Sequence, residues 1–160
     1  MIDEAHHPVD KNVRVQHTLA QAEQLCAQRG TRLTVLRRRV LEIILSKDTP
    51  QGAYAILDVL RDDGRLGAPP TVYRALDFLL AQGLIHRLAS RNVFIGCPRP
   101  GEHHSGQFLI CKDCGKVREL SSQALEVTIR EKASDYDFQV DSQIVEVLGH
   151  CHDCERDGSI

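Results

Sequence analysis

The chain of 160 residues lacks the features that mark membrane-spanning and secreted proteins. None of its apolar runs approaches the roughly 20 residues that a membrane-spanning helix requires, so we expect no membrane partner. Residues 1–7 are acidic and polar, with neither the basic start nor the apolar stretch of a secretory signal. We therefore expect a cytoplasmic protein whose cysteine thiols are reduced unless a metal ion holds them.

The motifs of zinc enzymes are missing as well. The chain has no HExxH motif and no HxE motif combined with PCxxC, which are signatures of zinc peptidases and zinc deaminases. A catalytic zinc also needs an open coordination position and a general base within reach. We therefore expect no enzymatic activity and no small-molecule substrate.

Charge is unevenly distributed, although the net charge is only −2. Residues 1–100 carry 14 Lys and Arg against 10 Asp and Glu, whereas residues 101–160 carry 6 against 12. A basic half joined to an acidic half favours the approach of the first half alone to a polyanion such as DNA. A chance scatter of solvated charges would give the same difference, so the motifs have to decide.

The first half is predicted to be mostly helical. Residues 1–15 are polar, and we interpret them as a flexible tail. Thr34 is placed to cap one helix at its start, and Gly30 and Gly83 are placed to end two others. Apolar residues at helical spacing predict helices over residues 16–28, 35–46, 53–61 and 70–82.

A β-hairpin is predicted directly after these helices. Residues 84–88 and 93–95 are short β-type runs, and residues 90–92 between them are typical of a turn. Helices followed by such a hairpin form the winged helix-turn-helix arrangement, whose last helix can lie in the major groove of DNA. We therefore assign residues 16–97 to a winged-helix DNA-binding domain.

The second half is predicted to be a small mixed domain. Residues 98–106, rich in Pro and Gly at their start, are interpreted as a hinge, and residues 107–160 as an α/β dimerisation domain. The whole chain is thus of the α+β class. So small a β-α-β set invites support from a metal ion and from dimerisation. Its elements are expected as strands over 107–111, 116–120, 138–140 and 144–148, with a helix from Ser121 or Ser122 to Ser134.

Two CxxC motifs form the most specific signal in the sequence. Cys111 and Cys114 make the first, Cys151 and Cys154 the second, and 36 residues separate them. Four thiolates suit the soft, tetrahedral preference of Zn²⁺, and such a closed site is structural and not catalytic. A redox or disulfide role is the alternative, which a reducing compartment disfavours.

A second zinc site is indicated around Cys97. This cysteine closes the predicted wing in a region that also contains His86, two adjacent histidines and Glu119. One thiolate, one or two imidazoles and a carboxylate suit zinc, although each residue is more often found at the surface or in a core. Cys26, within a helical pattern, is interpreted as a buried free thiol.

Several runs resemble the ferric uptake regulator family. The run PPTVYRALDFL at residues 69–79, with GLIH at 83–86, resembles the recognition helix and first wing strand of that family. The run CKDCGKV at residues 111–117, with GHC at 149–151 and Cys154, resembles its dimerisation domain, and RLT at 32–34 with Arg37 resembles an earlier helix start. The resemblance covers residues 16–155 and is specific in combination.

Within that family the chain is most similar to the zinc uptake regulator branch. The resemblance implies a homodimeric, zinc-loaded repressor that binds a palindromic, AT-rich operator in double-stranded DNA and controls zinc uptake genes. It also implies a regulatory zinc site formed by His86, Cys97, His104 and Glu119, with neighbouring His103 as an ambiguity. A third metal site of many family members would fall on Ser105, Gln107, Glu126 and Gln143, of which only Glu126 suits a metal, so we expect two zinc ions per subunit.

The resemblance also indicates the DNA contacts. Arg74 is expected to bond a guanine and Tyr73 to pack on a thymine methyl. The alternative is that Tyr73 belongs partly to the core and Arg74 binds phosphate only. The basic run over residues 37–39 is expected to supply a phosphate contact, or else to be a solvated helix face. The expected DNA-binding residues are Tyr73, Arg74, Thr71, Tyr54, Arg37, Arg38 and Arg91.

Two other functions remain open at this point. An iron- or peroxide-sensing regulator of the same family would have harder ligands than Cys97. A zinc-stapled interaction module would bind no DNA at all. Repression is the expected outcome, although the sequence leaves open the operator, the zinc affinity, the number of dimers per site and activation at some promoters.

Overall fold

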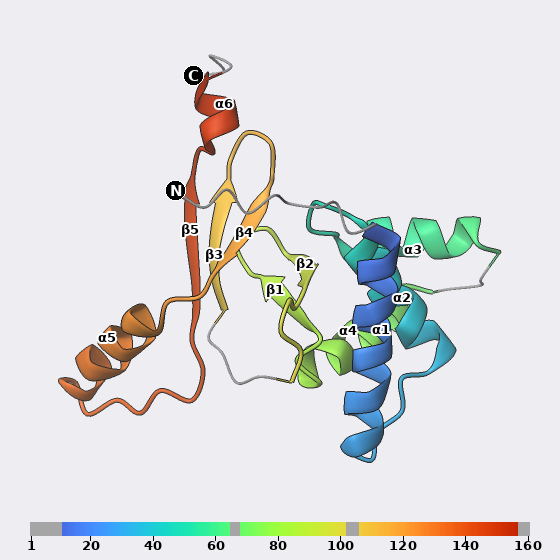
Figure 1. The fold of residues 1–160 in the computed structure, drawn as a ribbon, viewed down its shortest axis with the longest axis horizontal. Coiled ribbons are helices and arrows are strands. Elements are labelled where there is room, and N and C mark those ends of the chain that lie inside the picture. The colour runs from blue at the N-terminus through green and yellow to red at the C-terminus, as the bar shows by residue number, and fades with distance from the viewer. Residues whose placement is uncertain (1–10, 65–67, 102–105, 157–160) are drawn as a thin grey trace. The chain divides into compact units, whose positions relative to one another are not determined.

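A computed structural model describes residues 11–64, 68–101 and 106–156 of the chain (Figure 1). Its contacts divide the chain into two compact units. The first comprises the residues up to Arg87 together with Asn92–Gly101, and the second comprises Leu88–Arg91 together with the residues from Glu102 onward. The proposed hinge over residues 98–106 falls partly outside the described residues, so its bounds stay a prediction.

The first helix, α1 (Lys11–Gln28), begins earlier than the sequence analysis predicts. Residues 11–15 were expected in the flexible tail, but they form the first turns of this helix; residues 1–10 lie outside the described residues. Val15 explains the difference, because it is buried and precedes the buried Leu19 by four residues. The apolar face of the helix thus extends one turn further back than the polar composition indicates.

The next three helices match the prediction closely. They are α2 (Val35–Ser46), α3 (Ala53–Asp62) and α4 (Pro69–Ala81). Thr34 caps α2 by accepting a hydrogen bond from the backbone N–H of Arg37 at 3.4 Å. Gly83 follows α4 with a φ of 66°, a left-handed conformation that favours glycine.

The four helices enclose the hydrophobic core of the first unit. Each of them contributes several buried apolar side chains to one continuous cluster, and the cluster also includes Phe94 of the wing. Val40, Leu41, Ile43 and Ile44 place α2 in that core. A core of this extent allows the first unit to be stable without a metal ion.

The predicted wing is present as two short antiparallel strands, β1 (Ile85–Leu88) and β2 (Val93–Gly96). Asn92 in the connecting turn has a φ of 51°, a conformation that asparagine tolerates. A bridge between Gln51 and Phe94 joins the wing to the segment between α2 and α3. The wing therefore belongs to the helical layer and is not a free flap.

The second unit is a three-stranded sheet with a helix. The strand β3 (Gly106–Cys111) lies in the middle, antiparallel to β4 (Val117–Leu120) and parallel to β5 (Ile144–Gly149). The helix α5 (Gln123–Ser134) connects the two outer strands, and Ser122 caps it through a hydrogen bond from the N–H of Leu125. These features confirm the mixed α and β architecture that the sequence predicts.

Two local expectations were wrong. Residues 138–140 form no strand, and Phe138 is 66% exposed; Asp137 just before it has a φ of 55°, which turns the chain out of an extended path. An unexpected short helix, α6 (His152–Arg156), contains the second CxxC motif. Among the helices that the structure describes, none has the length and apolar character needed to cross a membrane.

Candidate metal centre and nucleic-acid interface

The two CxxC motifs come together at one end of the sheet. Cys111 ends β3 and Cys114 lies in the tight turn that follows, while Cys151 comes directly after β5 and Cys154 lies in α6. Because β3 and β5 run parallel, both motifs follow strand ends at the same edge. The four ligand atoms lie within 4.8 Å of one another, and this is the only such cluster among the described residues.

The spacing of the sulfurs fits a tetrahedral zinc ion. The Sγ atoms of Cys111 and Cys154 are 3.9 Å apart, and those of Cys114 and Cys151 are 3.7 Å apart. Four sulfurs held about 2.3 Å from a tetrahedral ion lie about 3.8 Å from each other. All four cysteines are free thiols, so the arrangement matches metal ligation and not a pair of disulfides.

Polar groups around the four cysteines favour the thiolate form at one of them. Hydrogen bonds from the backbone at Cys114 and Cys151 lower the pKa of Cys111 to about 6. The pKa of Cys154 is raised, first by its hydrogen bond with the Cys151 side chain. One thiolate is thus preformed near neutral pH, and zinc displaces protons from the remaining thiols as it binds.

Two polar pairs fix the loops that carry these cysteines. Nδ1 of His150 lies 2.6 Å from a carboxylate oxygen of Asp113, and Nζ of Lys116 lies 2.9 Å from one of Asp153. Each pair joins the first CxxC segment to the second. The sequence analysis did not identify them, because only the parallel pairing of β3 with β5 brings these residues together.

The expected regulatory ligands fall in different units. His86 in β1 and Cys97 after β2 belong to the first unit, and Glu119 in β4 belongs to the second. Cys97 is 1% exposed, and its backbone N–H donates to the carbonyl of Leu84 at 3.0 Å. His103 and His104 lie outside the described residues, so the choice between them stays open.

The position of a third metal site contains mainly amides. Gln107 is buried, and its Nε2 donates to the carbonyl of Ser122 at 3.0 Å. Both side-chain polar atoms of Gln143 are buried without a hydrogen-bond partner among the described residues. Glu126 lies 3.5 Å from Arg130, and Ser105 is not among the described residues. Two neutral amides and one carboxylate form a weak ligand set for a transition metal.

The helix α4 exposes the side that carries the expected base contacts. Tyr73 is 38% exposed and Arg74 is exposed next to it, whereas Val72, Ala75 and Leu76 are buried against the core. Thr71 is half-buried in the first turn. The helix therefore presents a phenol and a guanidinium outward from a firmly packed inner face.

A shallow apolar hollow lies beside these residues. It encloses about 140 Å³ and is lined by side chains of α3 and α4, including Tyr54, Leu57, Val72 and Tyr73. Tyr54 is 67% exposed at its rim. The hydroxyl of Tyr54 is free to reach outward, as expected for a phosphate donor.

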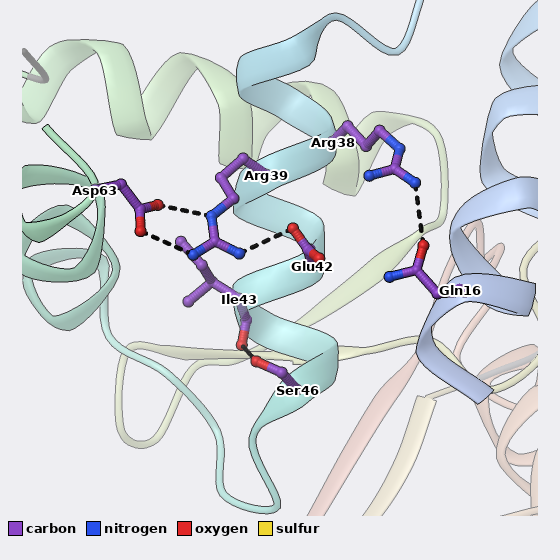
Figure 2. A network of polar contacts seen from close by, with 7 residues as sticks. All are labelled: Gln16, Arg38, Arg39, Glu42, Ile43, Ser46 and Asp63. Atoms are coloured by element: carbon purple, nitrogen blue, oxygen red, sulfur yellow. Dashed lines mark hydrogen bonds and ion pairs between the residues drawn. The ribbon is translucent and has the colours of Figure 1, made fainter. Parts of the chain in front are cut away.

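The three arginines at the start of α2 each contact a different part of the first unit. Arg38 reaches α1, where its Nε donates to Glu23 at 2.8 Å and its Nη2 to Gln16 at 3.3 Å. Arg39 bonds both carboxylate oxygens of Asp63, at 2.7 and 3.0 Å, and also reaches Glu42 (Figure 2). Of the expected DNA contacts in this run, both Arg37 and Arg38 have partners within the protein.

Arg91 also has a partner in its own unit. Its Nη2 donates to the carbonyl of Cys111 at 3.1 Å, and Leu88–Arg91 groups with the second unit. Glu146 of β5 accepts from the N–H groups of Ala89 and Ser90, at 2.7 and 3.2 Å. Burial raises the pKa of Glu146, but these hydrogen bonds outweigh it and lower the pKa below its ordinary value.

Comparisons with known proteins point to one family. The chain is 39% identical over 140 residues to the zinc uptake regulation protein of Escherichia coli (strain K12), which covers 87% of this chain and 82% of that protein. It is 30% identical over 134 residues to the ferric uptake regulation protein of the same strain, covering 80% and 88%. Among solved structures, a zinc uptake regulator complexed with zinc and DNA has a TM-score of 0.86 and 37% identity, covering 91% of this chain and 98% of that one.

The sequence pattern of one family matches most of the chain. That pattern extends over residues 28–148, from the end of α1 through β5. It therefore includes the recognition helix, the wing and the first CxxC motif. This chain belongs to the Ferric uptake regulator family.

Proposed function

We propose that this chain is a zinc-responsive transcriptional repressor that binds palindromic promoter DNA as a zinc-loaded homodimer and controls zinc uptake genes. The four-cysteine cluster with sulfur spacings of 3.7 and 3.9 Å carries the proposal, because it fits zinc. The similarity to zinc uptake regulators and to a zinc uptake regulator complexed with zinc and DNA supports the same function. A regulator of this kind acts in the cytoplasm and is not an enzyme.

We assign two zinc ions to each subunit. The first is structural and is held by Cys111, Cys114, Cys151 and Cys154. The second is regulatory and is held by His86, Cys97, His104 and Glu119. The burial of Cys97 supports its assignment as a ligand, because a thiolate in a site that excludes water is a strong zinc ligand.

The second zinc converts metal binding into DNA binding in this proposal. Its ligands belong to two units that residues 98–106 connect, so a bound ion restricts how the winged helices are oriented. Restricting them before DNA arrives lowers the ordering cost of binding an operator. By thermodynamic linkage, DNA raises the zinc affinity by the same factor by which zinc raises the DNA affinity.

A second copy of the chain supplies the symmetry of the operator. Within the second unit, Ile144, Val147 and Leu148 of β5 are 57%, 47% and 46% exposed, and β5 is an edge strand. Apolar side chains on an open edge are a surface for association with another chain. A two-fold dimer places two recognition helices on two half-sites of a palindrome. The proposed DNA contacts are Tyr73, Arg74, Thr71 and Tyr54, with Arg91 at the wing.

The experiment that tests this function measures DNA affinity as free zinc is buffered upward. The probe is a duplex that the wild-type protein selects from a randomised library, and the variant is Cys97→Ser. We expect steep zinc-dependent binding by the wild type and none by the variant, with both proteins dimeric. Equal binding at all zinc concentrations, or a Cys97→Ser protein that still responds to zinc, would refute the proposed sensing site.

A further inference from the structure

Arg37 contacts the recognition helix α4 from the side. Its Cζ lies 3.6 Å from the centroid of the Phe78 ring, and its Nη1 donates to the carbonyl of Arg32 at 2.8 Å. A guanidinium stacked on an aromatic face and anchored by a hydrogen bond is held in one place. Its charge is thus used within the first unit.

A second arginine contacts the other end of the same helix. Nη1 of Arg29, which follows α1, donates to the backbone carbonyl of Gln82 at 2.7 Å, and the side-chain oxygen of Gln82 lies 3.4 Å away. Gln82 is the C-terminal cap of α4. The carbonyl groups at a helix C-terminus carry partial negative charge, so a cation there stabilises the last turn.

These two contacts act on a flank of α4 that the core leaves free. The helix is buried through Val72, Ala75, Leu76 and Leu79, while Arg74 is exposed. Phe78 follows Arg74 by four residues, so the two side chains are neighbours on the helix surface. A contact on Phe78 therefore acts next to the residue expected to read bases, and it limits rotation of the helix about its axis.

We infer that Arg37 and Arg29 are positioning residues of the recognition helix and not phosphate contacts. They hold α4 in the orientation that aims Arg74 at the base edges, Arg37 through the ring of Phe78 and Arg29 through the carbonyl of Gln82. The inference rests on the proposed function for its DNA readout. It differs from the sequence-based expectation, in which Arg37 binds the DNA backbone.

The two roles predict different dependence on salt and sequence. A phosphate contact contributes equally on every duplex, and losing it lowers the slope of log affinity against log salt by about 0.9. A positioning residue affects only binding that needs correct base contacts. We expect Arg37→Met to lower affinity for the selected duplex roughly threefold to tenfold, with the affinity for a shuffled duplex and the salt slope unchanged. Arg29→Gln should give the same pattern.

A double-mutant cycle separates an action through Phe78 from other effects of the lost charge. We expect Arg37→Met to cause no further loss of selectivity in a Phe78→Leu background. Arg118→Met serves as the matched control, because Arg118 is an exposed arginine in β4 of the second unit, and it should change neither duplex affinity. Equal weakening on both duplexes with a smaller salt slope, or additive losses in the cycle, would overturn the inference.

Hydrogen exchange of the DNA-free protein provides a test that does not depend on the proposed function. We expect both variants to speed exchange of the amides in the last two turns of α4 and to leave the sheet amides unchanged. Unchanged exchange in α4 would overturn the inference even if DNA binding is confirmed. A wild-type protein that selects no duplex would refute the proposed function, while the exchange data would still decide the role of the arginines.

Discussion

Arg74 and Cys97 occupy opposite environments, and each environment suits the role proposed for the residue. Arg74 is exposed on the outer side of α4, where a guanidinium stays hydrated until it meets a partner. Cys97 is 1% exposed, and its backbone is tied to the start of the wing through Leu84. A buried thiol of this kind is either a small core residue or a ligand, and only a change in metal response separates the two roles.

Replacing Arg74 should weaken sequence recognition without weakening general DNA binding to the same extent. A bidentate arginine–guanine contact discriminates by about 1–3 kcal/mol, so we expect Arg74→Ala to lower affinity for the selected duplex roughly tenfold to a hundredfold. Fluorescence anisotropy on the selected and shuffled duplexes checks this. An equal loss on both would mean that Arg74 binds only phosphate.

The helix α2 is the element that organises the first unit. Its buried residues enter the core, and its three consecutive arginines point in different directions because successive helical residues are rotated by about 100°. Arg38 reaches α1, while Arg39 reaches Asp63 at the end of α3 (Figure 2). The basic run thus fixes neighbouring helices as well as raising the local positive charge.

The link between Arg39 and Asp63 is expected to stabilise the first unit. The two side chains are 29% and 28% exposed and form a bidentate pair, which favours a larger effect than that of a fully exposed ion pair. We expect Asp63→Asn to lower the free energy of unfolding by about 1 kcal/mol, measured by urea denaturation of the zinc-loaded protein.

Asp58→Asn is the matched control for that measurement. Asp58 forms a looser pair with Arg61 at 3.5 Å, and its side chain is 71% exposed. Its replacement should leave the unfolding free energy nearly unchanged. A loss of stability as large as that of Asp63→Asn would show that charge alone, and not the bidentate geometry, is responsible.

The two units of the molecule differ in how they are stabilised. The first encloses a continuous core from four helices and the wing, whereas neither α5 nor α6 contributes a buried residue to the second. Phe108, Ile110 and Cys111 of β3 are the main buried apolar residues of the second unit. Metal ligation and a second subunit are therefore expected to supply the stability that its own core does not.

Removing zinc should destabilise the second unit and leave the first folded. We expect a strong chelator to speed hydrogen exchange in β3 and β5 and to shift the dimer toward monomer, with little change in α2 and α3. Acid should act in the same direction, because protons compete with zinc for the thiolates. Exchange measured by mass spectrometry before and after chelation checks this. Uniform loss of protection in both units would contradict the expected independence of the first core.

The sequence by itself determined most of the elements and the structural metal site. Helical spacing, Thr34, Gly83 and Ser122 are local signals, and they predicted the bounds of α2 to α5 to within a residue or two, because caps and apolar faces depend on neighbours in the chain. The two CxxC motifs were equally local. The early start of α1 was missed because a single residue, Val15, carries that turn.

The tertiary structure alone decided which partner each charged side chain finds. Arg37, Arg38 and Arg39 look alike in the sequence, yet they contact three different parts of the first unit. The missing strand at residues 138–140 and the pairs around the cysteines depended likewise on which segments lie side by side. Long-range contacts of this kind arise from packing between segments distant in the chain, and no local pattern specifies them.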